Sequence, residues 1–228
     1  MSTLHKQLQA VKEELARMAG LVEKAIHEAS QALASRNVEL ARAIIRGDRP
    51  IDLIQNEVEN RCLTLMATQQ PVAVDLRFLY ASMLICGYLE RMGDQAKNVA
   101  RRVLALAKLA PDQTPLALLT MAEVAKEMAR DCLDAIARGD VKLAQQVVDR
   151  DDELDDLDGQ FLEDMIQWMT DERRVVRRGV EYILVARALE RIGDEATNIG
   201  EQVVFLVSGQ VLRHIEHTAE GPPPSQEQ

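Results

Sequence analysis

The chain contains an internal duplication. The decapeptide at residues 89–98, LERMGDQAKN, returns one hundred residues later at residues 189–198 as LERIGDEATN, with seven of ten positions identical. A second match, at an offset of 103, aligns residues 44–54 with residues 147–157. Internal similarity of this kind indicates two copies of one structural unit. We therefore expect two similar halves that share a continuous core.

The composition predicts an all-α fold. Hydrophobic residues make up 47% of the 228 positions, whereas aromatic residues make up only 3%. Ala, Leu, Val and Ile are abundant, while Gly and Pro are rare within the long segments. This composition is typical of packed helices rather than of sheets.

Apolar residues recur every three or four positions along most of the chain, which is the pattern of long amphipathic helices. Gln69, Gln70 and Pro71 interrupt this pattern, as do Pro111 and Pro115 near the midpoint. Proline suits the first turn of a helix but not its interior. The pattern predicts six long helices, at about residues 4–35, 38–69, 72–109, 118–138, 141–169 and 172–207.

The order of these helices predicts the architecture. Consecutive long helices with short connections pack against each other. We therefore expect two tandem antiparallel three-helix bundles, at residues 1–110 and 111–212. The last segment, residues 213–228, contains three consecutive prolines, and we expect it to be disordered.

Charge and cysteine content limit the classes of partner. The net charge of −10 argues against binding to nucleic acid, because phosphate contacts need a clustered basic surface. Cys62, Cys86 and Cys132 form no Cys-x-x-Cys pair and are expected to be core thiols of a reducing compartment. The N-terminus lacks the pattern of a signal peptide, and no apolar stretch reaches the roughly 20 residues of a spanning helix. These features predict a cytoplasmic protein.

Each half carries two acidic pairs. On a helix, residues at i, i+4 and i+8 share one face, so each decapeptide presents a Glu, an Asp and an Asn together. A second pair lies on the preceding helix, where Asp48 and Asp52 align with Asp151 and Asp155. Because neighbouring helices pack together, we expect the four carboxylates of one half to face a shared surface. Such oxygen-rich sites suit Mg²⁺, Mn²⁺ or iron, and zinc is less favoured without His or Cys ligands.

The alternative is that these acids form a solvated face with ion pairs to Arg49, Arg91, Lys97 and Arg191. An ordinary solvated face gives no reason to keep the same Glu, Gly, Asp and Asn in two halves that otherwise diverged. The glycine is also informative, because glycine inside a helix costs roughly 1 kcal/mol relative to alanine. Its presence in both copies indicates close approach of a neighbouring helix or of a bound group.

The sequence gives no positive sign of catalysis. It contains no phosphate-binding loop, no Ser-His-Asp pattern and no Glu-x-x-His motif of a di-iron oxidase. We therefore expect a protein that is not an enzyme. Two alternatives stay open, a carboxylate-bridged metal-dependent hydrolase and a purely structural helical scaffold.

The duplicated motif LER-[M/I]-GD-x-x-x-N, together with QQPVAVDLR at residues 69–77, resembles the PhoU family of phosphate-uptake regulators. The resemblance covers about residues 4–208. It implies a non-enzymatic protein, expected to be a homodimer, that binds divalent or trivalent metal ions, including multinuclear clusters, of iron, zinc, manganese or magnesium. The implied metal ligands are Asp48, Asp52, Glu90 and Asp94 in the first half and Asp151, Asp155, Glu190 and Asp194 in the second, with Asn98 and Asn198 as nearby polar support.

The resemblance also implies partners. In that family the protein works beside a phosphate ABC transporter and a phosphate-sensing histidine kinase, and it represses the phosphate-starvation response when phosphate is plentiful. We expect contact with the transporter's ATPase subunit and with the kinase, and membrane association only through these partners.

The chain departs from the family pattern in two places. Pro50 stands between Asp48 and Asp52, where the second half has Glu153, so we expect the first-half aspartates at the opening turn of a helix. The second half has no counterpart of Gln-Gln-Pro and is three residues shorter between its acidic motifs. The two halves are therefore expected to differ in metal count or affinity.

Overall fold

The computed structural model describes residues 3–209, and all of the regular structure in this range is helical. The predicted all-α fold of two three-helix bundles is confirmed. The expected disorder of residues 213–228 concerns a segment outside the described residues. The α-helices are α1 (Thr3–Ser35), α2 (Val38–Gly47), α3 (Arg49–Gln69), α4 (Val74–Leu106), α5 (Leu116–Arg138), α6 (Val141–Val148), α7 (Asp151–Asp171) and α8 (Val176–Ser208), with a 3₁₀ helix, η1 (Arg173–Val175), before α8.

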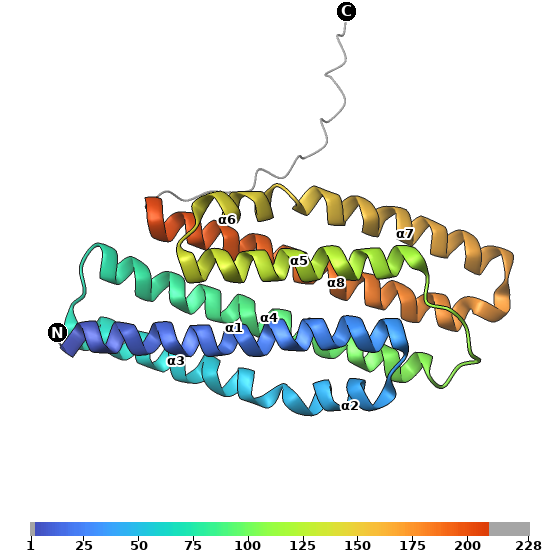
Figure 1. Cartoon of the computed structure of the whole chain (residues 1–228), viewed down its shortest axis with the longest axis horizontal. Coiled ribbons are helices and arrows are strands. Elements are labelled where there is room, and N and C mark those ends of the chain that lie inside the picture. The colour runs from blue at the N-terminus through green and yellow to red at the C-terminus, as the bar shows by residue number, and fades with distance from the viewer. Residues whose placement is uncertain (1–2, 210–228) are drawn as a thin grey trace, which may run out of the picture.

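The two bundles lie side by side (Figure 1). Helices α2 and α3 line one edge of the molecule, and α6 and α7 line the opposite edge. Between these edges α1 contacts α5, and α4 contacts α8, so two helices of each half form the seam. None of the helices within residues 3–209 combines the length and the hydropathy that crossing a membrane needs.

The second helix of the first half is divided at Asp48, so the prediction of one continuous helix at residues 38–69 is wrong at that residue. Helix α2 ends at Gly47, α3 begins at Arg49, and Asp48 lies between them. Pro50, in the first turn of α3, explains the division, because its ring and missing N–H prevent a continuous helix. As Pro50 predicted, Asp48 and Asp52 stand at the opening turn.

The second half is divided at the equivalent place, so the prediction of one continuous helix at residues 141–169 is also wrong. Helix α6 ends at Val148 and α7 begins at Asp151. No proline acts here. Instead Asp151, Asp152 and Glu153 occupy the first turn of α7, where negative side chains stabilise the positive end of the helix dipole.

The remaining boundaries follow local signals. Helix α3 ends before Gln70, which adopts a left-handed conformation with φ of 46°, and Pro71 follows it. Helix α5 ends at Arg138, and Gly139 follows it with φ of 64°. The Asp140 side chain then caps α6 by accepting hydrogen bonds from two backbone N–H groups. Helix α4 is shorter than predicted, since it spans Val74–Leu106 rather than residues 72–109.

One hydrophobic core runs through both halves. Its largest fully buried side chains come from both bundles, which agrees with the expectation of a shared core. The domain boundary at residues 110 and 111 stays a prediction. Equivalent core positions of the duplication are buried alike: Ile51 is 2% exposed and Leu154 1%, while Val58 is fully buried and Phe161 is 2% exposed.

The repeated glycines lie against these core residues. A Cβ added at Gly93 would stand 3.0 Å from the Ile51 Cδ1, and one added at Gly193 would stand 2.6 Å from the Leu154 Cδ2. Of the two explanations left open by the sequence, the structure therefore supports close approach of a neighbouring helix.

The connection between the halves is fixed by side chains of α8. Arg178 donates hydrogen bonds to Asp112 (2.6 Å) and to the Ala110 carbonyl oxygen (2.5 Å). The Tyr182 hydroxyl donates to the Gln113 carbonyl oxygen and accepts from Arg36 at 2.6 Å. The linker is thus held against both α8 and the end of α1.

Candidate metal centre

Three carboxylates converge in the second half. Asp155 comes from α7, and Glu190 and Asp194 come from α8, one turn apart. One oxygen of each can be chosen so that all three lie within 4.8 Å of one another. Since metal–oxygen distances are about 2.0–2.6 Å, two oxygens on one ion lie at most about 5 Å apart. The three residues therefore fit a single hard metal ion.

The packing of α7 on α8 sets this geometry. Leu154, next to Asp155, is buried against Gly193, which stands next to Asp194. The contact fixes the separation of the two helices at the level of the acids. Asp155 is exposed, whereas Glu190 and Asp194 are partly buried, so the site opens to solvent on the α7 side.

The fourth predicted ligand of this half, Asp151, lies at the start of α7. Its Oδ1 accepts a hydrogen bond from the Thr197 hydroxyl at 3.1 Å. Burial, followed by the charges of Glu190 and Asp151, raises the pKa of Asp194 to about 7. The carboxylates therefore repel one another, and a cation among them would relieve that repulsion.

Asp158 was missed as a neighbour of the site. The sequence motifs assign Asp158 no role, yet it is only 4% exposed. Its Oδ2 forms an ion pair with Arg187 at 2.7 Å. Burial and then the charge of Asp158 raise the pKa of Glu190. The duplication could not reveal Asp158, because the first half has Gln55 at the aligned position.

The first half gathers its four predicted ligands around a lysine. Lys97 of α4 forms ion pairs with Asp48 and, at 2.5 Å, with Asp94. Burial lowers the pKa of Lys97, but the hydrogen bonds to Asp48 and Asp94 outweigh it, and the pKa is raised. The sequence suggested Lys97 only as an ion-pair partner of acids on a solvated face. The difference between Lys97 and the aligned Thr197 in the duplicated decapeptide is the sequence feature that could have indicated its position.

The other two acids of the first half stand beside this pair. Burial and then the charge of Asp48 raise the pKa of Asp52, and burial and then the charge of Asp94 raise the pKa of Glu90. The first-half acids therefore stand around the ammonium group of Lys97, and their role as metal ligands stays a prediction. Across residues 3–209, only the second-half triad brings three acidic, His or Cys side chains within the stated distance.

A model of the PhoU domain matches residues 15–103 and, a second time, residues 118–203. The chain belongs to the PhoU family. The resemblance drawn from the decapeptides is thus confirmed, and the two matches follow the two halves of the duplication.

Relatives of the PhoU family match along nearly the whole chain. The phosphate-specific transport system accessory protein PhoU homolog of Aquifex aeolicus is 37% identical over 211 residues, which are 92% of this chain and 96% of the relative. The crystal structure of PhoU from Pseudomonas aeruginosa matches with a TM-score of 0.88 at 32% identity, over 91% of this chain and 100% of that chain. The phosphate transport system regulatory protein PhoU from Streptococcus pneumoniae matches with a TM-score of 0.84 at 28% identity, over 93% and 100%.

The asparagines of the PhoU decapeptides form hydrogen bonds with neighbours on their own helices. Asn98 donates to Gln95 and accepts from Arg101, and Asn198 donates to Glu195. Their predicted role as polar support of the metal ligands stays a prediction. Arg91, proposed for the solvated-face alternative, instead forms a bidentate pair with Glu195 across the α4–α8 seam, at 2.6 and 3.0 Å.

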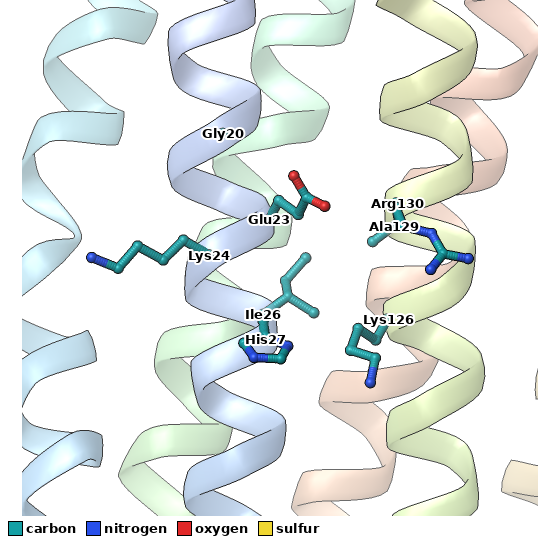
Figure 2. A pocket seen from close by; sticks show the side chains of 8 residues that line it. All are labelled: Gly20, Glu23, Lys24, Ile26, His27, Lys126, Ala129 and Arg130. Atoms are coloured by element: carbon teal, nitrogen blue, oxygen red, sulfur yellow. The ribbon is translucent and has the colours of Figure 1, made fainter.

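A cavity of about 500 Å³ lies between α1 and α5 (Figure 2), and none of the predicted metal ligands lines it. Lys24, Lys126 and Arg130 line it, yet Figure 2 shows Lys24 directed away from α5, and Arg130 directed away from α1. Lys126 forms an ion pair with Glu123 of its own helix. Because these cationic groups do not converge, the cavity is not assigned as a site of this PhoU family member.

Proposed function

We propose that the chain is a non-catalytic regulator of phosphate uptake that represses the phosphate-starvation response when phosphate is plentiful. Membership of the PhoU family supports this proposal. So do the names of the relatives, which are an accessory protein of a phosphate-specific transport system in Aquifex aeolicus and a regulatory protein of phosphate transport in Streptococcus pneumoniae.

The main observation in support of a metal site is that Asp155, Glu190 and Asp194 converge. In our proposal these residues hold a metal ion, with Asp151 next to them as a further ligand of a multinuclear centre. An all-oxygen donor set favours magnesium, manganese or iron, and accommodates zinc less well. The metal would neutralise the repelling carboxylates and join α7 to α8.

The proposed mechanism is that of an adaptor in the cytoplasm. A rigid helical body, as a homodimer, contacts the ATPase subunit of a phosphate ABC transporter and a phosphate-sensing histidine kinase. Binding that favours one state of the kinase shifts its population toward that state, without any chemistry on the adaptor. The metal-loaded surface on α7 and α8 belongs to this contact in our proposal.

The test is repression in the source organism, with a phosphate-controlled alkaline phosphatase as the reporter. Deleting the gene is expected to raise phosphatase activity at abundant phosphate, and the wild-type gene is expected to lower it again. The double variant Glu190→Gln, Asp194→Asn should fail to lower it, although the protein accumulates normally.

A matched control changes two exposed acids on the same α7 surface, Asp152→Asn with Asp156→Asn. This control should repress like the wild type, since neither residue belongs to the triad. Phosphatase activity that stays low after gene deletion would contradict the repressor assignment and point to control of transport alone.

A further inference from the structure

The two acidic clusters differ at one aligned position of the decapeptides. Lys97 stands in the first half where Thr197 stands in the second. Both side chains reach across to the start of the preceding helix. Lys97 bonds Asp48 at the α2–α3 junction, and the Thr197 hydroxyl bonds Asp151 at the start of α7. The duplication thus keeps the contact but exchanges an ammonium for a hydroxyl.

The ammonium of Lys97 lies within the first cluster rather than at its rim. It pairs with Asp48 from one element and with Asp94 from another. The side chains of Lys97 and Asp48 are only 16% and 11% exposed. A positive charge therefore already occupies the place between the α2–α3 junction and α4 where a shared metal ion would have to lie.

We propose that Lys97 is an internal counter-ion that replaces a metal ion in the first half, so that the chain binds metal only through its second half. The inference rests on the metal site of the proposed function. A metal ion entering the first cluster would have to displace the ammonium from two carboxylates or lie beside it, where like charges repel. Lys97 is also covalently attached, which gives it a high effective concentration at these carboxylates.

The consequence is a division of roles between the duplicated halves. At the junction of α2, α3 and α4, Asp48 and Asp94 always have the ammonium of Lys97 as a counter-charge. At the contact of α7 with α8, the triad of Asp155, Glu190 and Asp194 gains an equivalent central cation only when metal is present. Dependence of this protein on metal therefore enters through the second half alone.

The test is manganese binding to the tag-free full-length protein, measured as ions bound per chain and as affinity by calorimetry. Exchanging the aligned residues gives two reciprocal variants. Lys97→Thr is expected to open the first cluster and to raise the bound manganese about twofold. Thr197→Lys is expected to place an ammonium among the second-half carboxylates and to lower manganese affinity at least tenfold.

Lys126→Thr is the matched control, because Lys126 also pairs with an acid three residues earlier on its own helix, Glu123. This variant should bind manganese like the wild type. Circular dichroism checks that each variant stays helical, and Lys97→Met replaces Lys97→Thr if the latter does not fold.

The variants Asp94→Asn and Asp194→Asn separate failure of this inference from failure of the proposed metal site. If Asp194→Asn loses manganese and Asp94→Asn does not, the result supports both the second-half metal site and the role of Lys97. Equal loss in the two variants would overturn the role of Lys97 and leave the second-half site standing. If the wild type binds no manganese, the proposed second-half site fails. In that case manganese binding gained by Lys97→Thr would still support Lys97 as a counter-ion. No gain in Lys97→Thr would overturn that role of Lys97.

Discussion

Gly193 of α8 lies directly against Leu154 of α7, since a Cβ added at Gly193 would stand 2.6 Å from the Leu154 Cδ2. The next residue of each helix, Asp194 and Asp155, belongs to the carboxylate triad. The missing side chain therefore sets the helix separation at which these acids meet. The equivalent pair in the first half, Gly93 and Ile51, is more relaxed at 3.0 Å.

Replacing Gly193 by alanine is expected to destabilise the protein. Alanine improves helix propensity by about 1 kcal/mol, but crowding of a filled core costs typically about 1–3 kcal/mol, and Leu154 is only 1% exposed. Urea denaturation should give a net loss of about 1 kcal/mol. Gly159→Ala on α7 is the control, because nothing lies within 4 Å of the added Cβ, and it should stabilise. A Gly193→Ala variant as stable as Gly159→Ala would contradict the packing account.

Removing the Tyr182 hydroxyl is expected to loosen the connection between the halves. The hydroxyl donates to the Gln113 carbonyl oxygen at 3.2 Å and accepts from Arg36. Tyr182→Phe should lower the free energy of unfolding by about 1–2 kcal/mol, because the Gln113 carbonyl oxygen and the charged Arg36 donor both lose their partner. Tyr80→Phe is the control, since the Tyr80 ring is 53% exposed and packs edge-on against Phe205. Equal effects of the two changes would argue against the clamp.

Loss of Arg187 from its ion pair with Asp158 is expected to destabilise the protein more than loss of both charges together. The Asp158 side chain is 6% exposed, whereas that of Arg187 is 46% exposed. Arg187→Gln leaves a buried carboxylate without its cation and should cost about 1–3 kcal/mol by thermal unfolding. Adding Asp158→Asn should recover much of that loss, because the amide carries no charge. A double variant no more stable than Arg187→Gln would exclude this explanation.

The three cysteines are expected to be unreactive in the folded protein. Burial raises the pKa of Cys62 to about 11, that of Cys86 to about 12, and that of Cys132 further still. Only the thiolate attacks alkylating reagents, so modification at neutral pH requires unfolding. Mass spectrometry after iodoacetamide treatment should find no adduct on the native chain and three in urea. Rapid single labelling of the native chain would place one thiol outside the core.

Much of the fold follows from the sequence because the apolar period and the prolines act locally. Pro71 marks the end of α3, and Pro50 places Asp48 at a helix opening. The division between α6 and α7 has no proline to mark it, and α7 instead begins with an acidic first turn. Sequence analysis therefore predicted one helix there where the structure has two.

The candidate site was predictable as far as the duplication reached. The repeat identified Asp155, Glu190 and Asp194, which the structure brings together. It could not identify Asp158, which has no aligned acid. Nor could spacing along one helix show that Lys97 reaches Asp48 on another element, because that contact depends on how α4 packs against the α2–α3 junction.

The most direct test of the central claim is an anomalous difference map from crystals grown with manganese. The claim is that the second-half carboxylates hold the metal. The map should contain manganese in contact with Asp155, Glu190 and Asp194, and no anomalous density between Asp48 and Asp94. A triad without manganese in a crystal that contains the ion in its solvent would contradict the claim.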